Sequence, residues 1–393
     1  MNYILFDGTS RNALLPFTYT RPVAEIRVGV LTIREKWEKY LGYTTTTVTE
    51  DYLSDKYPMV EFDVNIMINA SYLPNQELVD KIINLKENQI ILDGDVPVAF
   101  HIAKGQEVDF DTYQKIPIES RNQRRVQNTY DIFSNNPAEI VNDVELITKD
   151  RISHPLDPNN QAIGVEKIFI EEGAKVNLAL LNATEGPIYI GKNAEIMEGC
   201  MIRGPFALCD NATLKMGAKI YGGTTVGPHS KVGGEVSNSV IFGYSNKGHD
   251  GFLGNSVVGE WCNLGADTNT SNLKNNYAAV RLWNYETKRF VDTGLQFCGL
   301  MMGDHSKCGI NTMFNTGTVV GVNANIFGGG FPRNFIPSYS WGGSGGFTTY
   351  LTRKAFEVAK MVMSRRKLEF TEVDQKILQH VFEETHEWRK SYS

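Results

Sequence analysis

The stretch that decides the fold is residues 190–232, IGKNAEIMEGCMIRGPFALCDNATLKMGAKIYGGTTVGPHSKV. Aliphatic residues recur in it at every sixth position, at Ile190, Ile196, Ile202, Leu208, Leu214, Ile220, Val226 and Val232. A small residue stands four places after most of them, at Ala194, Cys200, Ala212, Ala218, Thr224 and Ser230, with Phe206 as the one large exception. This period suits neither a helix, which repeats about every 3.6 residues, nor a flat amphipathic strand, which repeats about every 2. It predicts a parallel β-helix, in which each six-residue unit forms one side of a triangular coil and the aliphatic residue points inward.

The same repeat returns twice further along the chain. The second array is Phe252, Val258 and Leu264, and the third is Met302, Cys308, Phe314, Val320 and Ile326. We therefore expect the coil to run from about residue 168 to residue 326, with residues 327–346 as a loop that leaves it. The repeat breaks between the first two arrays, at residues 243–251.

The chain before the coil alternates short apolar runs with helical patterns. The expected strands are residues 3–6, 43–48, 65–69, 89–92 and 96–102, and the expected helices are residues 31–41 and 76–85. This alternation predicts an α/β domain with a parallel sheet. A Pro- and Asn-rich break at residues 154–160 marks a domain boundary. The predicted domains are residues 1–155 (α/β), 156–346 (coil) and 347–393 (a helical C-terminal segment).

Bulk composition excludes several partners. The 393 residues carry a formal net charge of −6, so we expect neither nucleic acid nor an anionic membrane as partner. The sequence shows no basic segment followed by a long apolar run at its start, and no apolar stretch long enough to span a membrane. The five cysteines have no CxxC spacing, and we expect them reduced and buried in the coil. A cytoplasmic protein is expected.

A Gly-rich turn, Gly8-Thr9-Ser10-Arg11, follows the first expected strand. Backbone N–H groups of such a turn point at bound phosphates, and basic side chains supply charge for a triphosphate. We expect Gly8, Thr9, Arg11 and Arg21 to bind a nucleotide.

The order LFDGTSR, LPFT, RP over residues 5–22 resembles the signature of sugar-1-phosphate nucleotidyltransferases. Gly8, Arg11, Pro16, Thr18 and Pro22 match at plausible places, whereas one glycine is missing and Val23 stands where the family has a lysine. The resemblance implies a Rossmann-like domain in which a sugar-1-phosphate attacks the α-phosphorus of a nucleoside triphosphate with Mg²⁺.

That family binds Mg²⁺ through the aspartate of a Gly-Asp-x-Pro turn. Gly94-Asp95-Val96-Pro97 looks like this turn and makes Asp95 the candidate metal ligand. The strand order offers a second candidate segment, residues 67–71 (MINAS), which contains no aspartate. Both alternatives remain open at this point.

The break in the repeat contains a histidine, and polar interruptions of a regular scaffold are where chemistry is expected. His229 and His305 occupy outward repeat positions, where we expect solvated side chains. The segment Lys247–Gly254 (KGHDGFLG), together with GPFA at residues 204–207 and NLGADT at residues 263–268, resembles the acetyltransferase domain of GlmU-type bifunctional enzymes.

By that resemblance His249 is the general base that takes a proton from the acceptor amine during attack on acetyl-CoA. Asn263 and Asn272 would hydrogen-bond the sugar or the acyl group, and the backbone around Gly265-Ala266 would bind the acyl donor. Three positions depart from the family pattern in ways that concern the substrate. Leu208 stands where the family has an arginine that binds the sugar phosphate, and Phe252 and Leu273 stand where the family has tyrosines.

The resemblance implies a cytoplasmic enzyme of UDP-N-acetylglucosamine synthesis that uses acetyl-CoA, a nucleoside triphosphate, a sugar-1-phosphate and Mg²⁺. It also implies a left-handed coil and a homotrimer. Two alternatives stay open. One is a single activity, either a sugar-1-phosphate nucleotidyltransferase such as a glucose-1-phosphate thymidylyltransferase or an acyltransferase alone. The other is a non-catalytic sugar-nucleotide-binding protein.

Overall fold

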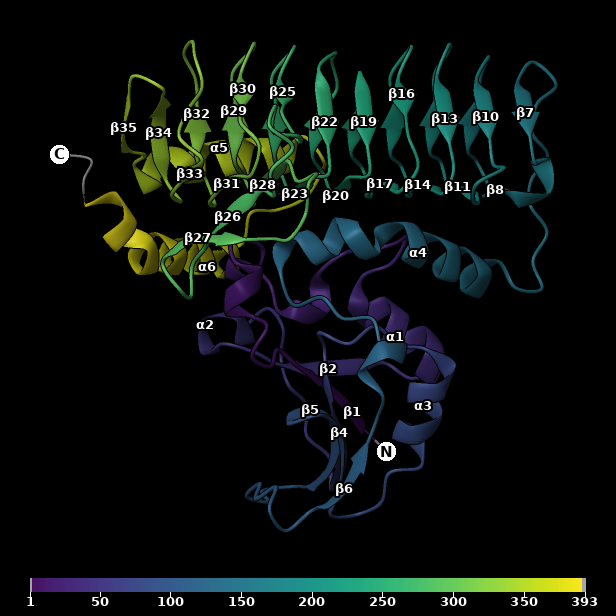
Figure 1. The fold of residues 1–393 in the computed structure, drawn as a ribbon, viewed down its shortest axis with the longest axis vertical. Coiled ribbons are helices and arrows are strands. Elements are labelled where there is room, and N and C mark those ends of the chain that lie inside the picture. The colour runs from purple at the N-terminus through teal and green to yellow at the C-terminus, as the bar shows by residue number, and fades with distance from the viewer. Residues whose placement is uncertain (1, 391–393) are drawn as a thin grey trace.

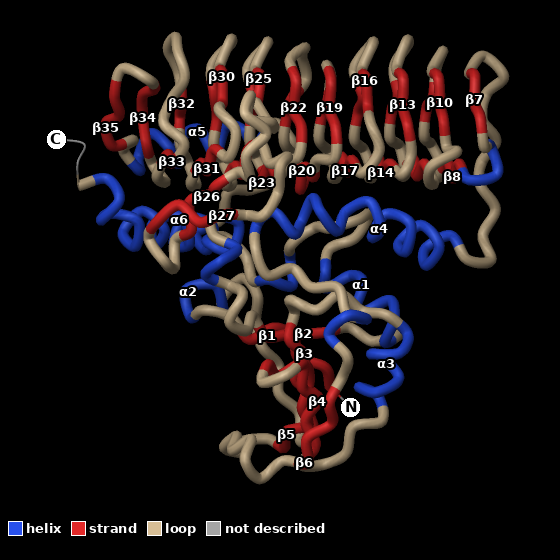
Figure 2. The backbone as a smooth tube through the Cα atoms, in the orientation of Figure 1, coloured by secondary structure: helices blue, strands red, loops and turns tan. Residues whose placement is uncertain are grey.

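The computed structural model describes residues 2–390. A long coil of strands lies across the top of the molecule in Figure 1, an α/β domain lies below it, and helix α4 runs between the two. Helices occur in the first domain, between the domains and near the C-terminus, whereas the coil consists of short strands and turns (Figure 2). No helix within residues 2–390 is long and apolar enough to cross a membrane.

The first domain is built on one six-stranded sheet of order β2-β1-β3-β5-β4-β6. Its strands are β1 (Asn2–Phe6), β2 (Thr45–Val48), β3 (Val64–Asn69), β4 (Gln89–Asp93), β5 (Val96–Ala103) and β6 (Gln114–Pro117). The expectation of a parallel sheet is corrected, because β5 runs antiparallel to both β3 and β4. The reason is a tight turn at Gly94 and Asp95, which reverses the chain directly after β4.

The helices of this domain begin and end at capping residues. Helix α1 (Ile33–Leu41) starts with a capping box between Thr32 and Glu35 and ends at Gly42 in the left-handed conformation. Helix α3 (Gln76–Ile83) is capped by the side chain of Asn75, and α2 (Asp51–Ser54) is a single turn. Both longer helices agree with the predicted ones.

The predicted coil is confirmed as a three-sided parallel β-helix. Its first face consists of β7 (Gln161–Ile163), β10 (Leu180–Asn182), β13 (Met201–Arg203), β16 (Lys219–Ile220), β19 (Glu235–Ser237) and β22 (Phe252–Gly254). The second face consists of β8 (Ile168–Ile170), β11 (Ile188–Ile190), β14 (Phe206–Leu208), β17 (Thr224–Val226), β20 (Val240–Gly243), β23 (Val257–Glu260), β28 (Leu300–Met302), β31 (Thr318–Val320) and β33 (Phe335–Ile336).

The third face consists of β9 (Lys175–Val176), β12 (Glu195–Ile196), β15 (Thr213–Leu214), β18 (Lys231–Val232), β21 (Asn246–Lys247), β24 (Asn263–Leu264), β29 (Lys307–Cys308), β32 (Asn325–Ile326) and β34 (Ser340–Gly343), with β35 (Gly346–Thr349) antiparallel at its end. Two small sheets complete the coil, β25 (Asn269–Thr270) with β30 (Met313–Phe314), and the hairpin of β26 (Arg281–Asn284) and β27 (Arg289–Asp292).

The repeat positions predict the interior of the coil with two corrections. Every aliphatic residue of the first array is buried in one apolar core, together with Phe206. Phe252 does not point inward as predicted, because Leu253 pairs with the core residue Val236 and takes that place. The coil also continues past residue 326, since β33 and β34 still pair with its second and third faces.

Helix α4 (Thr129–Thr148) fixes the first domain to the second face of the coil. On the coil side, Asn136 Nδ2 donates to the carbonyl of Gly223 at 2.7 Å. On the other side, the buried carboxylate of Asp143 accepts from the N–H of Val30 at 2.7 Å and from the ammonium of Lys36. The helix therefore bonds to both domains.

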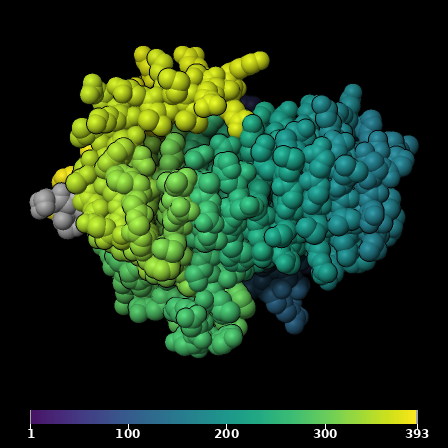
Figure 3. Space-filling view, turned by 90° about the horizontal axis from the view of Figure 1, so that it is seen from above, coloured from purple at the N-terminus to yellow at the C-terminus, as the bar shows by residue number. Residues whose placement is uncertain are grey.

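The C-terminal segment forms helices α5 (Thr352–Ser364) and α6 (Glu372–Glu384), as predicted, and residues 391–393 of the predicted segment lie outside the described residues. Figure 3 shows this segment, in yellow, beside the later turns of the coil. The carbonyl of Leu378 in α6 accepts from the hydroxyl of Tyr339 in the coil at 2.7 Å. Helix α6 also contacts α2 of the first domain, so three parts of the chain meet there.

Candidate functional site

The loop after β1 is held by the carboxylate of Asp7. This carboxylate accepts from the N–H of Val23 and from the hydroxyl of Thr49, both at 2.6 Å, and from Arg11 Nη1 at 3.2 Å. Gly8 is in the left-handed conformation with φ +61°, while Thr9 is exposed. The loop is thus held by hydrogen bonds at Asp7, while Gly8 is partly exposed and Thr9 is exposed.

Arg11 lies in this loop, but its guanidinium is buried and paired. It contacts the carboxylate of Asp7 at 3.2 Å and that of Glu50 at 3.2 Å, and it donates to the hydroxyl of Tyr52 at 2.8 Å. Its charge is therefore largely balanced by two carboxylates within the protein.

Arg21 does not join the other residues predicted to bind a nucleotide. Its guanidinium is buried between the domains, where it donates to the carboxylate of Asp304 and lies 3.4 Å from that of Glu260. Thr18, another residue of the signature, is fully buried and donates to the carbonyl of Arg11 at 2.7 Å. The second half of the signature thus packs inside the protein.

The two candidate metal segments occupy different positions. Asp95 is exposed in the turn between β4 and β5. Asn69, at the end of β3, lies beside the loop, because a Cβ on Gly8 would approach its Nδ2 to 2.9 Å. The amide of Asn69 is engaged at both atoms, since Nδ2 donates to the carbonyl of Pro97 and Oδ1 accepts from the N–H and the hydroxyl of Ser71.

These residues do not fit a protein-held Mg²⁺ beside the loop. Mg²⁺ prefers carboxylate oxygens together with substrate phosphates, and an engaged amide stands at that position. Within residues 2–390 no cluster of three or more His, Cys, Asp or Glu residues is arranged to hold a metal ion.

His249 lies in the turn between the third and first faces of the coil, and its side chain is exposed. Main-chain bonds hold this turn in place. The carbonyl of Lys247 accepts from Gly233 at 2.7 Å, that of Asp250 from Asp267 at 3.1 Å, and that of Gly251 from Glu235 at 3.2 Å. An imidazole therefore projects to solvent from a well-ordered corner.

The two asparagines flank this corner on different faces. Asn263 is exposed on the third face, in the strand next to β21. Asn272 lies beyond the first face, where its Nδ2 donates to Asn255 Oδ1 at 2.8 Å and where a Cβ on Gly254 would meet both that amide and the ring of Phe252. Within one chain, Asn263 thus lies beside β21, which precedes the His249 turn, and Asn272 lies beside the end of β22, which follows it.

Gly265 and Ala266 lie in the turn that follows Asn263. A Cβ on Gly265 would come within 2.4 Å of the backbone of Gly309, so only glycine fits there. The carbonyl of Ala266 accepts from the N–H of Asn311 at 2.8 Å. Both residues are partly exposed.

Three features of the site region are absent from the sequence prediction. Lys247 is buried, at 3% exposure. His305 is buried under the first domain, and this burial lowers its pKa to about 3. The prediction that its side chain is solvated was therefore wrong. The environment of His305 comes from segments distant in sequence, which no repeat pattern indicates.

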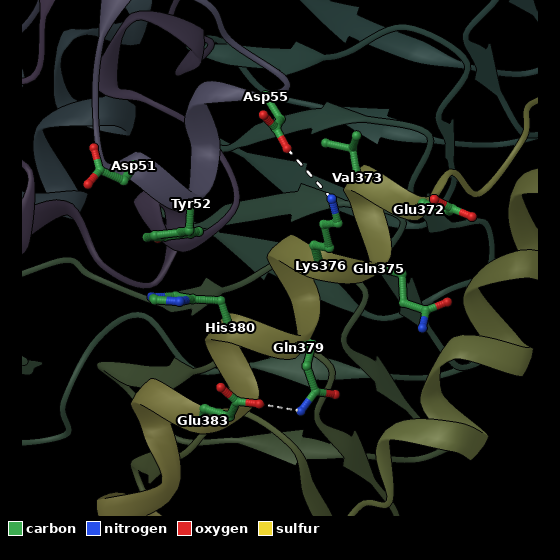
Figure 4. A pocket seen from close by; sticks show the side chains of 10 residues that line it. All are labelled: Asp51, Tyr52, Asp55, Glu372, Val373, Gln375, Lys376, Gln379, His380 and Glu383. Atoms are coloured by element: carbon green, nitrogen blue, oxygen red, sulfur yellow. Dashed lines mark hydrogen bonds and ion pairs between the residues drawn. The ribbon is translucent and has the colours of Figure 1, made fainter.

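The third feature is a cleft of about 650 Å³ between α2 and α6 (Figure 4). The ring of Tyr52 stacks on that of His380 with centroids 3.8 Å apart. Tyr52 also accepts the hydrogen bond from Arg11, so the glycine loop is linked to the C-terminal helix. Four carboxylates line this cleft, at Asp51, Asp55, Glu372 and Glu383.

The first domain is similar to a known family. Residues 3–152 match the family model of sugar nucleotidyl transferases. The match ends just after α4 and covers the whole sheet of the first domain. The predicted resemblance of this domain is thereby confirmed.

Curated relatives match the chain over shorter stretches. Bifunctional protein GlmU of Methanocaldococcus jannaschii is 36% identical over 92 residues, 23% of this chain and 22% of its own length. A bifunctional sugar-1-phosphate nucleotidylyltransferase/acetyltransferase of Sulfurisphaera tokodaii is 32% identical over 147 residues, 37% of this chain and 36% of its own length. An uncharacterized acetyltransferase of Escherichia coli, YaiX, is 28% identical over 149 residues, 37% of this chain and 64% of its own length. The chain thus spans less than two thirds of each of these relatives.

Proposed function

We propose that this protein is a transferase of sugar-nucleotide synthesis whose coil acylates an amino-sugar phosphate, with acetyl-CoA as donor and glucosamine-1-phosphate as acceptor. The observation that supports this most is the exposed imidazole of His249 on a turn whose backbone is held by hydrogen bonds. Histidine is the side chain that most often serves as a general base.

In the proposed reaction, His249 removes a proton from the acceptor amine as its nitrogen bonds to the thioester carbonyl carbon. The carbon–sulfur bond then breaks, and coenzyme A leaves as a thiol after taking that proton. Asn263 and Asn272 would hydrogen-bond the acceptor or the acyl group. The backbone of Gly265 and Ala266 would contact the donor.

The test is acetyl-CoA consumption with glucosamine-1-phosphate by wild-type protein and by His249→Ala. Loss of a general base lowers the rate by ~10²–10⁴-fold. His229→Ala is the matched control, because His229 also lies at a corner of the coil but stacks on Tyr244 with centroids 4.8 Å apart. Equal turnover by His249→Ala and wild type would end the proposal.

A second candidate activity is uridylyl transfer to N-acetylglucosamine-1-phosphate in the first domain. The family match over residues 3–152 favours it, whereas the burial of Arg21 and the engaged amide of Asn69 weigh against it. Pyrophosphate release from UTP and the sugar phosphate with Mg²⁺ tests it. Release by wild type, lost in Gly8→Val, would support transfer, and nucleotide binding without release would indicate a binding domain.

We also propose that the protein acts as a homotrimer. A largely apolar groove lies along β7, β10, β13 and β16 of the first face of the coil. Leu180, Met201 and Tyr221 are 45%, 43% and 46% exposed along it, and exposed apolar surface of this kind marks association sites. Light scattering should give three times the chain mass for the wild type. The double variant Leu180→Glu, Met201→Glu should have the mass of a single chain.

A further inference from the structure

A lysine occupies a core position of the coil. Ile241, Lys247 and Leu253 are spaced six residues apart, and Lys247 pairs in register with the core residue Val232. The inward residues around it on the third face are aliphatic or thiol, namely Val176, Ile196, Leu214, Val232, Leu264, Cys308 and Ile326. The six-residue repeat therefore continues through the segment that the sequence presents as a break.

The ammonium of Lys247 stays inside the coil because it finds a main-chain partner. Its Nζ donates to the carbonyl of His249 at 2.7 Å. Burial lowers the pKa of Lys247 to about 8, against the raising effect of Asp250 and Asp267. An aliphatic residue at this position would avoid the cost of burying a charge, so packing alone does not account for the lysine.

The carbonyl of His249 is also confined by the preceding turn of the coil. Gly234 has φ +75°, and a Cβ there would come within 2.9 Å of the carbonyl oxygen of His249. The main chain of His249 thus lies between the ammonium of Lys247 and the backbone of the preceding turn. The side chain of His249 is left exposed.

We propose that Lys247 is a positioning residue for the acyl transfer: from inside the coil it fixes the main chain of His249, so that the imidazole projects from one defined place at the corner. This inference rests on the proposed function of His249. Its physical basis is that a displacement of ~1 Å at a reacting group costs ~10²-fold in rate.

The experiment compares Lys247→Met with the matched variant Lys307→Met. Lys307 is also a largely buried lysine of the third face with its pKa lowered to about 8, and its Nζ donates to a histidine carbonyl, that of His305, at 2.7 Å. Both variants lose the same kind of bond, but only Lys247 bonds to the His249 turn. We expect Lys247→Met to lower kcat for acetyl transfer by ~10–100-fold, with KM for acetyl-CoA within about twofold of wild type, and Lys307→Met to keep kcat.

Amide hydrogen exchange gives a readout that does not depend on turnover. The N–H groups of Glu235 and Asp267 donate to carbonyls of the His249 turn, and their exchange should become faster in Lys247→Met but not in Lys307→Met. Should Lys247→Met fail to fold, Lys247→Gln, which places no charge in the core and is too short to make the same bond, gives the same comparison.

The outcomes separate this inference from the proposed function. If the wild type transfers acetyl groups but Lys247→Met and Lys307→Met have equal kcat, the positioning role alone would be overturned. Unchanged amide exchange at Glu235 and Asp267 in Lys247→Met would also overturn it. No acetyl transfer by wild type would overturn the proposed function, and this inference would fall with it. Reduced kcat and faster exchange confined to the Lys247 variant would support it.

Discussion

Arg21 of the first domain donates a hydrogen bond to the carboxylate of Asp304 in the coil, 283 residues further along the chain. The hydroxyl of Thr20 donates to the same carboxylate oxygen at 2.7 Å, and the other oxygen accepts from the N–H of Glu260 at 2.8 Å. Both Arg21 and Asp304 are buried. A segment that resembles a nucleotide-binding signature therefore anchors the first domain to the coil.

Asp304→Ala should destabilise the protein strongly. Within residues 2–390, the substitution leaves the buried guanidinium of Arg21 with Glu260 as its one remaining carboxylate partner, and breaking a buried pair from one side costs ~3–5 kcal/mol. Urea unfolding should show this loss in the free energy of unfolding. The control is Glu387→Ala, which breaks the exposed pair with Lys288 and should cost less than ~1 kcal/mol; equal losses in the two variants would show that the interdomain pair is not buried.

Burial of His305 should make stability depend on pH. Its pKa is lowered to about 3 by burial and by the charge of Lys307, against the raising effect of Asp304, while Lys56 and Asp374 also face it with opposite effects. Between about pH 3 and the pKa of histidine in the unfolded chain, near 6.5, His305 binds fewer protons in the folded state than in the unfolded state. The free energy of unfolding that is present above about pH 6.5 is therefore lost as the pH falls.

The His305→Phe variant, which keeps an aromatic ring but cannot be protonated, should lose less stability than wild type on acidification. The difference should be about 2 kcal/mol between about pH 6.5 and pH 5, at about 1.4 kcal/mol per pH unit. Unfolding curves at the two pH values measure it. Parallel losses in both proteins would mean that His305 is exposed to solvent.

Neighbouring positions of the repeat should respond very differently to truncation. Leu214 is fully buried inside the coil, whereas Thr213, one residue earlier, points outward from the same strand. Leu214→Ala should cost ~2–5 kcal/mol through lost burial and a cavity, and Thr213→Ala about 0.5 kcal/mol or less. Thermal or urea unfolding of the two variants checks the inward register, and a larger loss at Thr213 would contradict it.

Alanine substitutions at two glycines with similar backbone conformations should cost different amounts of stability, because the surroundings of the two glycines differ. Gly234 has φ +75°, and a Cβ there would come within 2.8 Å of the carbonyl oxygen of Gly251; Gly217 has φ +71°, and a Cβ there would meet nothing within 4 Å in the described part of the chain. Gly217→Ala should cost about 1–2 kcal/mol for the left-handed conformation alone. Gly234→Ala should cost roughly 1–3 kcal/mol more through overpacking, and it should displace the His249 turn and slow acetyl transfer. Equal stability of the two variants would show that the turn has room to move.

Several residues of the candidate site could be assigned only from the folded chain. The signature around Gly8 indicated the nucleotidyltransferase resemblance, which the family match confirmed. It did not indicate that Arg21 turns away into the coil, because the partners of Arg21 come from β23 and from the turn after β28. Likewise the motif around His249 could be recognised in the sequence, but the proposed positioning role of Lys247 depends on the direction of its side chain.

The coil is predictable from the sequence alone, because a six-residue period of aliphatic side chains is a local pattern that each turn repeats against the one before it. The alternation of strands and helices in the first domain and the helical C-terminal segment are predictable in the same way. The folded chain was needed to show that Leu253 rather than Phe252 faces inward and that Lys247 keeps the repeat, because shortened units after Val232 shift the phase of the coil. It was also needed to show the burial of Arg21 and His305, because their surroundings are assembled from segments hundreds of residues apart.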